Sequence, residues 1–478
     1  MTEYALGIDM GTSGVKVAAL DLTSLRLATL AMQGYDNSPQ QPSTMLWDAT
    51  AGAIRSAVAG IDARAIRAIS FSSQMHGTVL YDERDDVIDP IINWQDKRCD
   101  APLDRYVGRS TVEVMRDRLA DADLYDLGID FIPSGYLGAT LFHIKENEPA
   151  LFDRILHVLL PGDFIRGKLL GASDHATDPT NAFGAGLFNT RLNRWHAGVI
   201  DKLGLPPGIL PVVRDTAEIA GALPRDVAHS LGLAPGVPVV CGGGDNQMSL
   251  LGNGLIAGDS PALINIGTGA QVSQVTSQFA RKAGIDTRSH FNGTFVFVGA
   301  SMGGGRNHAQ LRGVLCQREG RDIGYQEMDE LASQAPVGAN GLEFQLSSRG
   351  EAQRREGFVG RTELQDVGHL TRAVMEGIML DLYRLRPPTG SSPFMVGAGK
   401  GLQKSKAWAQ IAADLFDRPI RITHFENAVW GAALIAALGV GAVRDVRDAV
   451  ATIQYSQQVL PDAARAAQYR DLIAQRLA

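Results

Sequence analysis

The sequence contains little cysteine and no long apolar run. Its three cysteines, Cys99, Cys241 and Cys316, are far apart and lack the Cys-x-x-Cys spacing of metal and redox motifs. Such cysteines are typical of reduced, structural thiols, so we expect a cytoplasmic protein. No apolar stretch is long enough to cross a bilayer, and we see no basic segment followed by an apolar one of the signal-peptide kind. We therefore expect neither a membrane span nor a secretory signal.

Positive charge is not in excess either. Lysine and arginine total 45 residues against 52 acidic residues, which gives a formal net charge of -7. This balance argues against nucleic acid and anionic membranes as partners. The 478 residues, 45% of them hydrophobic, suffice for two or three domains with large cores.

One apolar stretch near the start carries a single acid. Residues 5–22, ALGIDMGTSGVKVAALDL, place Asp9 just before a turn of small residues, Gly11 to Gly14. A β-hairpin in which Asp9 caps the turn is one interpretation. The other is a phosphate-binding turn, because small residues let backbone N–H groups approach an anion, with Asp9 facing the accompanying cation.

A second stretch repeats this pattern. Residues 262–276, ALINIGTGAQVSQVT, again run from an apolar strand through a turn, Gly267-Thr268-Gly269, to another strand. Asn265 stands where the first copy has Asp9. Two similar hairpins half a chain apart predict two halves of similar architecture. Two such turns could hold a polyphosphate from both sides.

The remaining chain predicts a mixed α/β protein. In the first half we expect strands over 4–9, 15–21 and 66–72, and helices over 48–60, 139–148 and 153–170. A segment rich in proline and glycine, 204–236, predicts a boundary near residue 235 and hence domains of 1–235 and 236–478. In the second half we expect a strand over 237–241, a loop over 242–246, a helix over 247–251, a loop over 386–392, a strand over 394–396, and helices over 403–416 and 426–438.

Two polar clusters in the first half could bind a ligand. The segment 72–77, SSQMHG, ends an apolar strand, where open α/β sheets place ligands; a hydrogen-bonded turn with a satisfied His76 is the alternative. The segment 92–98, INWQDKR, sets Trp94 beside amide, acid and guanidinium groups, which suits a polyhydroxylated ligand. A surface turn with a local Asp96–Arg98 pair would explain it equally well.

Two glycine-rich segments in the second half have different chemistry. Three glycines precede Asp245 in CGGGDN at 241–246, and each glycine loses much backbone entropy on folding, so they are unfavourable for a simple turn. Asp245 could accept a proton from a hydroxyl nucleophile. The segment 396–401, VGAGKG, is no P-loop, because Lys400 is followed by Gly401 rather than Ser or Thr. It is either a strand-to-helix turn or a flat loop against a purine ring.

One motif points to a different enzyme class. Residues 299–303, GASMG, match the G-x-S-x-G nucleophile elbow, and a serine hydrolase built on Ser301 could use Asp381 and His424. That interpretation leaves both hairpins and the loop before Asp245 unexplained, so we rank it a distant second.

Taken together, six motifs resemble a known family. In chain order they are GIDMGTSGVK, SSQMHG, NWQDKRC, GGGDNQ, NIGTG and GAGKGL. This set is similar to the FGGY carbohydrate kinases over nearly the whole chain, from Leu6 to about Leu438. The resemblance implies an α/β fold of two ribonuclease H-like domains, of the actin/Hsp70/hexokinase type, with a catalytic cleft between them. It also implies ATP and Mg²⁺ as cofactors and a sugar as substrate.

The resemblance assigns roles residue by residue. Asp245 matches the family's catalytic base and Asp9 the acid that positions Mg²⁺. The phosphates would meet Gly11, Thr12 and Ser13 from the first domain and Gly267, Thr268 and Gly269 from the second. The adenosine would lie at Gly397, Gly399, Lys400 and Gly401. The open-chain sugar would lie at Gln74, Met75, His76, Trp94, Gln95 and Asp96, next to Asp245.

The motifs also bear on which sugar the protein phosphorylates. The QMHG motif resembles both xylulokinases and sedoheptulokinases, the segment from Trp94 to Cys99 looks closer to the sedoheptulokinase type, and the GGGDN run is xylulokinase-like. We predict phosphorylation of a terminal ketose hydroxyl, with sedoheptulose first and D-xylulose as the alternative. A catalytically inactive sugar or nucleotide sensor is a third class. Related kinases are often homodimers, although the sequence carries no interface signature.

Overall fold

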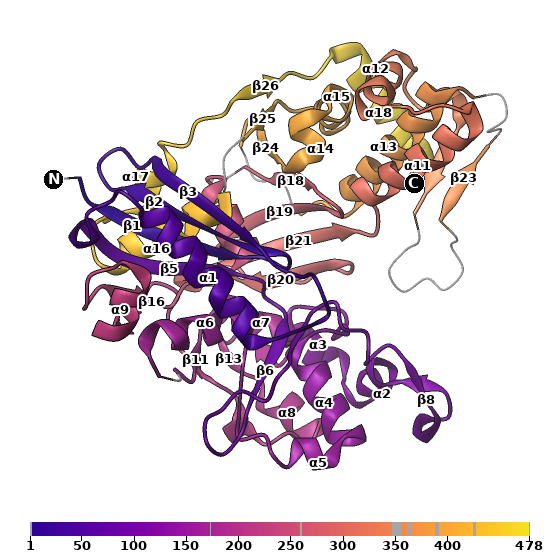
Figure 1. The fold of residues 1–478 in the computed structure, drawn as a ribbon. Coiled ribbons are helices and arrows are strands. Elements are labelled where there is room, and N and C mark those ends of the chain that lie inside the picture. The colour runs from indigo at the N-terminus through magenta and orange to yellow at the C-terminus, as the bar shows by residue number, and fades with distance from the viewer. Residues whose placement is uncertain are drawn as a thin grey trace.

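The structure is a computed structural model. It describes residues 2–172, 174–258, 261–346, 356–360, 365–387, 392–423 and 427–477. Two seven-stranded mixed sheets dominate it (Figure 1). The first runs in the order β15-β16-β5-β1-β2-β3, with β17 also paired to β5. Its strands are β1 (Tyr4–Met10), β2 (Gly14–Asp21), β3 (Leu27–Gly34), β5 (Ile66–Ser73), β15 (Ile219–Ala222), β16 (Pro238–Val240) and β17 (Gly243–Gly244).

The second sheet runs in the order β20-β21-β19-β18-β24-β25-β26. Its strands are β18 (Leu263–Ile266), β19 (Ala270–Thr276), β20 (Ile285–Ser289), β21 (Phe295–Ser301), β24 (Met395–Ala398), β25 (Ile420–Ile422) and β26 (Gln457–Val459). Both sheets share one unit: an antiparallel hairpin, β1–β2 or β18–β19, whose first strand also pairs in parallel with a later strand, β5 or β24. The two predicted hairpins and the similarity of the two halves are therefore confirmed.

Helices cover the sheets from distant parts of the chain. On the first sheet, α1 (Ser43–Val58) covers β2 and β3, and α16 (Asn427–Gly439) lies on β1, β2 and β5 (Figure 1). The approach of α16 is so close that a Cβ at Gly7 would lie 2.7 Å from the Ala433 backbone nitrogen. A late helix thus completes the core of the first sheet, which explains why α16 is apolar around its whole circumference.

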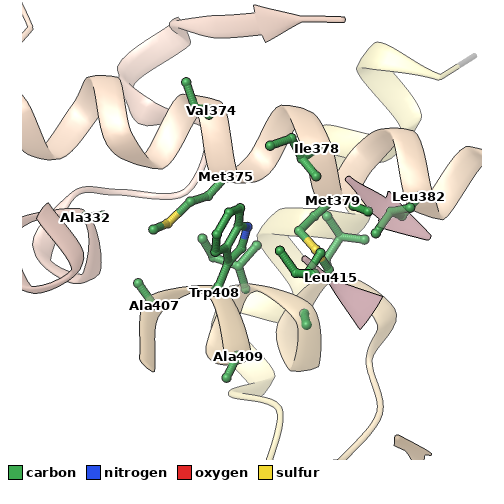
Figure 2. Close-up of a cluster of buried hydrophobic side chains, with 14 of the residues drawn as sticks. Ala332, Val374, Met375, Ile378, Met379, Leu382, Ala407, Trp408, Ala409 and Leu415 are labelled. Atoms are coloured by element: carbon green, nitrogen blue, oxygen red, sulfur yellow. The ribbon is translucent and has the colours of Figure 1, made fainter. Parts of the chain in front are cut away.

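The second sheet is backed by a helical layer. It contains α11 (Gly305–Glu319), α12 (Tyr325–Gln334), α13 (Val367–Arg384), α14 (Gly399–Lys404), α15 (Lys406–Phe416) and α18 (Ala463–Arg476). Figure 2 shows the buried Trp408 of α15 surrounded by Met375, Ile378 and Met379 of α13 and by Leu415. A buried ion pair, Arg372 Nε to Glu376 Oε1 at 2.8 Å, ties α13 to the Tyr469 hydroxyl of α18.

A smaller region, which includes β6 and α4, lies below the first sheet in the view of Figure 1. It has a four-stranded sheet in the order β10-β6-β7-β4. These strands are β4 (Gln40–Gln41), β6 (Gly77–Tyr81), β7 (Ile91–Asn93) and β10 (His157–Leu159). The helices around the first half are α2 (Thr111–Arg118), α3 (Asp121–Leu127), α4 (Leu137–Asn147), α5 (Pro149–Phe152), α6 (Pro161–Leu170), α7 (Pro179–Gly184), α8 (Ala197–Lys202) and α9 (Arg225–Leu231).

Several predicted element boundaries were wrong. The helix expected over 153–170 contains strand β10, and α6 begins only at Pro161, where a missing N–H costs nothing. The long helix expected over 403–416 is two helices, because Ser405 caps α15. The expected loop 242–246 contains β17 and the start of α10 (Asp245–Gly252). Residues 388–391 of the expected loop and residue 426 of the last expected helix lie outside the described residues.

One observation bears on the predicted domain boundary near residue 235. Strand β16 pairs with β15 and with β5, and β17 pairs with β5, so the first sheet includes strands beyond that position. The split into 1–235 and 236–478 remains a prediction. Among the described helices, none is long and apolar enough to cross a membrane.

Candidate active site

Two acids meet at the ends of parallel strands. In the β1–β5 register Asp9 lies opposite Ser72, and in the β5–β17 register Ser72 lies opposite Gly243. Asp245 follows β17 directly and starts α10. The Ser72 hydroxyl donates to Asp9 Oδ1 at 2.7 Å and fixes that carboxylate. Because parallel strands end at one edge of a sheet, the fold brings these residues to the edge where α/β proteins bind ligands.

Asp245 has the protonation behaviour of a general base. Burial and, next, the negative charge of Asp9 raise the pKa of its carboxyl to about 7. The Asn246 N–H, which donates to Asp245 Oδ1 at 2.8 Å, and the cation of Arg288 oppose this shift. A base whose pKa lies near the working pH is close to optimal for taking a proton from a hydroxyl group.

The three glycines before Asp245 are explained by close packing. Gly242 has a φ of +75°, and a Cβ there would lie 2.7 Å from the Phe71 backbone. A Cβ at Gly243 would meet Thr180 Oγ1 at 2.6 Å, and one at Gly244 would clash with Met75. The Gly244 N–H donates to Thr180 Oγ1 at 2.8 Å, so this loop, and with it Asp245, is rigidly placed.

The first small-residue turn is held from several sides. The Tyr35 hydroxyl donates to the Gly11 carbonyl, and Gln41 Nε2 donates to the Thr12 carbonyl at 3.2 Å. Trp94 Nε1 donates to Thr12 Oγ1 at 2.9 Å. Within the described chain, the N–H groups of Thr12 and Ser13 make no hydrogen bond. A fixed turn with two N–H groups available fits an anion site.

The second turn lies next to the segment that the sequence predicts to bind the adenosine. The Gly305 N–H donates to the Gly267 carbonyl at 2.9 Å, and the Arg306 N–H donates to the Thr268 carbonyl at 3.1 Å. Thus the start of α11 supports this turn, while Thr268 and Gly269 are exposed. Gly399 has a φ of +82°, and a Cβ there would lie 2.5 Å from the Ile266 carbonyl.

Of the other residues in the segment 397–401, Gly397 and Gly401 are tightly packed and Lys400 is exposed. A Cβ at Gly401 would clash with Ile266, and one at Gly397 would meet Ile420 at 2.9 Å, whereas Lys400 is exposed. The fold therefore joins the turn at 267–269 to the segment 399–401. In the parts of the chain that the structure describes, no hydrogen bond links either of them to the first turn at 11–14.

A cavity of about 270 Å³ lies beside these elements. Its walls include two residues of the predicted sugar set, His76 and Trp94, and residues between 129 and 134. Its other polar and aromatic lining residues are Lys97, Tyr136, Asp286 and Arg288. Strand β20 brings the last two from the second sheet, so both halves of the chain contribute to this cavity.

His76 is held as a neutral acceptor. Burial lowers the pKa of His76 to about 4. Its Nδ1 lies 2.9 Å from the Gly184 carbonyl oxygen, which can only accept, so Nδ1 carries the proton and Nε2 is left as an acceptor. The ring stacks on Tyr136 with centroids 4.0 Å apart. The satisfied His76 that the sequence left open as an alternative is therefore compatible with a ligand at Nε2.

The other residues predicted to bind the sugar do not line this cavity. Both polar atoms of the Gln74 amide and Oε1 of Gln95 are buried without a hydrogen-bond partner among the described residues. Met75 packs against Gly244. The Asp96 carboxylate accepts two hydrogen bonds from the Arg98 guanidinium, at 3.0 and 3.1 Å, one from the Arg98 N–H at 2.9 Å and one from Gln40. The local Asp96–Arg98 pair is thus present, and Asp96 is not among the cavity-lining residues.

The hydrolase interpretation receives no support. Ser301 ends β21 and its Oγ accepts a hydrogen bond from the Gly303 N–H at 3.1 Å. Asp381 is paired with Arg384 at 2.9 Å, and His424 lies outside the described residues. No described histidine contacts Ser301. The glycines after Ser301 instead support the second turn, since a Cβ at Gly304 would lie 2.5 Å from Gly269.

The sequence missed several residues of the site. Tyr35, Tyr136, Asp286 and Arg288 come from segments without a glycine-rich or otherwise distinctive pattern. Only the pairing of β20 into the second sheet and its contact with the first half bring the last two to the cavity. A pair of opposite charges at i and i+2 on a strand was the one available signal, because such residues share a face.

This architecture defines a class of enzymes, the ATP-dependent sugar kinases with a two-domain, actin-like fold. A gluconate kinase structure from Lactobacillus acidophilus superposes with a TM-score of 0.88 at 22% identity, covering 100% of this chain and 97% of that one. A xylulose kinase from the same organism gives 0.87 at 22% identity, covering 99% and 97%. These similarities confirm the predicted fold class.

The chain belongs to the FGGY family of carbohydrate kinases, whose N-terminal domain matches residues 4–252. It is 28% identical over 472 residues to a xylulose kinase of Staphylococcus epidermidis, covering 94% of this chain and 90% of the relative. It is 26% identical over 489 residues to a xylulose kinase of Bacillus subtilis, covering 96% and 94%. The protein is an ATP-dependent sugar phosphotransferase, as the sequence motifs predicted.

Proposed function

We propose that the protein transfers the γ-phosphoryl group of ATP to a terminal hydroxyl of a ketose, with D-xylulose as the substrate and Asp245 as the base. One observation carries this proposal: Asp245 starts α10 at the edge of the first sheet and has a pKa of about 7. A primary alcohol is a poor acid, so Asp245 orients the hydroxyl and takes its proton late in the transfer.

The phosphate and metal assignments follow the same geometry. We assign Gly11, Thr12 and Ser13 to the phosphates from the first half, and Gly267, Thr268 and Gly269 from the second. Gly397, Gly399, Lys400 and Gly401 are assigned to the adenosine. Asp9 would hold Mg²⁺, which would neutralise charge on the phosphates. A single protein carboxylate suits Mg²⁺, which usually binds one or two carboxylates plus substrate phosphates.

The cavity favours a neutral sugar. Its lining holds two cations, Lys97 and Arg288, and two carboxylates, Asp130 and Asp286, so the formal charges cancel. Hydroxyl groups both donate and accept hydrogen bonds and match such a mixed wall, whereas a sugar acid would bring an unbalanced charge. The named relatives support D-xylulose over sedoheptulose, which our sequence analysis ranked first from the segment after Trp94.

The test is a coupled ADP-release assay with Mg-ATP and a panel of acceptors. The panel holds D-xylulose, sedoheptulose, ribulose, fructose, glycerol and the acid gluconate. We expect the largest kcat/KM with D-xylulose. A larger value for sedoheptulose would restore the first substrate prediction with the same mechanism. Turnover of gluconate alone would contradict the neutral-sugar argument, and binding of ATP with no acceptor turned over would favour a sensor.

A further inference from the structure

Arg288 occupies a position in the cavity that no sequence motif marks. It lies on β20, two residues after Asp286, so both side chains leave the same face of the strand. Arg288 Nη2 donates to Asp286 Oδ2 at 2.9 Å, and the two side chains are only 11% and 9% exposed. The guanidinium carbon also lies 5.6 Å from the centre of the Phe183 ring of α7. An arginine fixed by a carboxylate and an aromatic face is already oriented before a ligand arrives.

The second half of the chain is anchored so that Arg288 reaches the first half. The Thr287 N–H donates to the Gly128 carbonyl at 2.8 Å, directly next to Arg288. The Gly284 N–H donates to Asp130 Oδ2 at 2.9 Å, and Arg281 is ion-paired with the same Asp130. These contacts hold β20 against the segment 128–130, of which Ile129 and Asp130 line the cavity. They therefore position Arg288 in the cavity wall, which also includes His76 and Tyr136.

The guanidinium has unused hydrogen-bonding capacity. Arg288 donates to Asp286 from Nη2; its Nε is buried without a partner among the described residues, and its Nη1 makes no hydrogen bond to any described residue. A buried donor left unpaired destabilises the native state, so the unpaired guanidinium is explained by a ligand that completes its hydrogen bonding. Arg288 lines the cavity together with His76 and Trp94 of the predicted sugar set, so its guanidinium borders the space proposed for the acceptor.

We propose that Arg288, oriented by Asp286, donates hydrogen bonds to oxygens of the acceptor sugar in the cavity, and that it is a substrate-binding residue contributed by the second half of the chain. This inference rests on the proposed function for the location of the acceptor. Because Asp286 balances the charge of Arg288, the pair selects polyhydroxylated neutral acceptors, to which the guanidinium offers hydrogen-bond donors. Binding of the sugar would thereby join the two halves across the cavity.

The test compares Arg288→Met with a matched control, Arg67→Met. Arg67 lies on β5 and forms an exposed pair with Glu3 at 2.6 Å, remote from the cavity. Binding of D-xylulose is measured calorimetrically, and the KM values for D-xylulose and Mg-ATP are measured by ADP release. We expect Arg288→Met to raise the dissociation constant and KM for D-xylulose roughly tenfold or more, with the KM for ATP changed less than about twofold, and Arg67→Met to change none of them.

The outcomes separate this inference from the proposed function. A sugar KM and dissociation constant that stay at the wild-type values in Arg288→Met contradict the inference alone. A wild-type protein that neither binds nor phosphorylates D-xylulose or any other sugar of the panel contradicts both. If Arg288→Met does not fold, Arg288→Lys is measured instead: it keeps the charge but loses the planar fork, so a weaker sugar affinity with normal ATP affinity supports the inference and wild-type sugar affinity contradicts it.

Discussion

Asp9 and Asp245 stand on either side of Ser72, one at the end of β1 and the other just after β17, with β5 between them. The negative charge of Asp9 is the second-largest cause, after burial, of the raised pKa of Asp245. The carboxylate of Asp9 therefore helps to set the pKa of Asp245. A metal bound at Asp9 would partly cancel this charge, so the two assignments, metal and base, depend on each other.

The pH dependence of turnover should report Asp245. The base is active only when deprotonated, and its pKa is about 7 in the protein without ligands. We expect kcat/KM for D-xylulose, measured with Mg-ATP kept well below its own KM so that the enzyme is free of ligands, to rise with pH through about 7 and then to level off. A kcat/KM that is constant between about pH 5.5 and 8 would contradict the assignment of Asp245 as the base.

The same pKa shift predicts a stability cost. A carboxyl whose pKa is raised by folding stabilises the native state only while it is protonated, so this contribution is lost as the pH rises from about 4 through 7. Asp245→Asn should therefore have a higher free energy of unfolding than the wild type at pH 8, by up to about 4 kcal/mol, and so melt at a higher temperature, while the two proteins should melt at nearly the same temperature at pH 4. Scanning calorimetry at both pH values measures this. A difference that does not grow with pH would show that burial of Asp245 is not costly.

Asp9→Asn separates a metal role from a turn cap. Asparagine keeps an acceptor for the Ser72 hydroxyl but removes the charge. We expect the Mg²⁺ concentration for half-maximal activity to rise roughly tenfold or more, while the dissociation constant for D-xylulose without nucleotide stays within about twofold. Equal losses in both measurements would mean that Asp9 only supports the turn. The exposed Asp36, beyond the hairpin, serves as the control site for the same change, Asp36→Asn, and should alter neither value.

Gly399 tests the assigned nucleotide segment. With a φ of +82° and no space for a Cβ beside Ile266, Gly399→Ala must distort the segment 399–401. We expect the KM for ATP to rise roughly tenfold or more, with the affinity for D-xylulose unchanged. Gly313→Ala in α11 is the control, because nothing lies within 4 Å of the added methyl group. An unchanged KM for ATP in Gly399→Ala would remove this segment from the nucleotide site.

Much of the fold could be read from local patterns. The two hairpins, the strand before Asp245 and the glycine-rich segment after β24 all follow from apolar runs interrupted by small residues. The helix expected over 153–170 failed, because β10 is too short to show a period and its pairing with β6 lies far away in sequence. Likewise, nothing local indicates that α16 covers the first sheet or that the first sheet continues beyond residue 235.

The candidate site was predictable in part for the same reason. Asp9, Asp245 and the small-residue turns carry their pattern in the sequence. Arg288 and Asp286 carry only opposite charges two residues apart, and their role depends on the anchoring of β20 to the 128–130 segment. Asp96 is a different case: its carboxylate accepts hydrogen bonds from Arg98 and Gln40, so its part in sugar binding stays a prediction.

The central claim is that Asp245 takes the proton from the sugar hydroxyl. It is tested most directly by ADP release with D-xylulose and saturating Mg-ATP, measured side by side for the wild type and Asp245→Asn, with sugar binding measured on the same samples. The account predicts a loss in kcat of roughly 10³-fold, within the range for a general base, and a dissociation constant for D-xylulose that changes little. A kcat for Asp245→Asn near the wild-type value would contradict it.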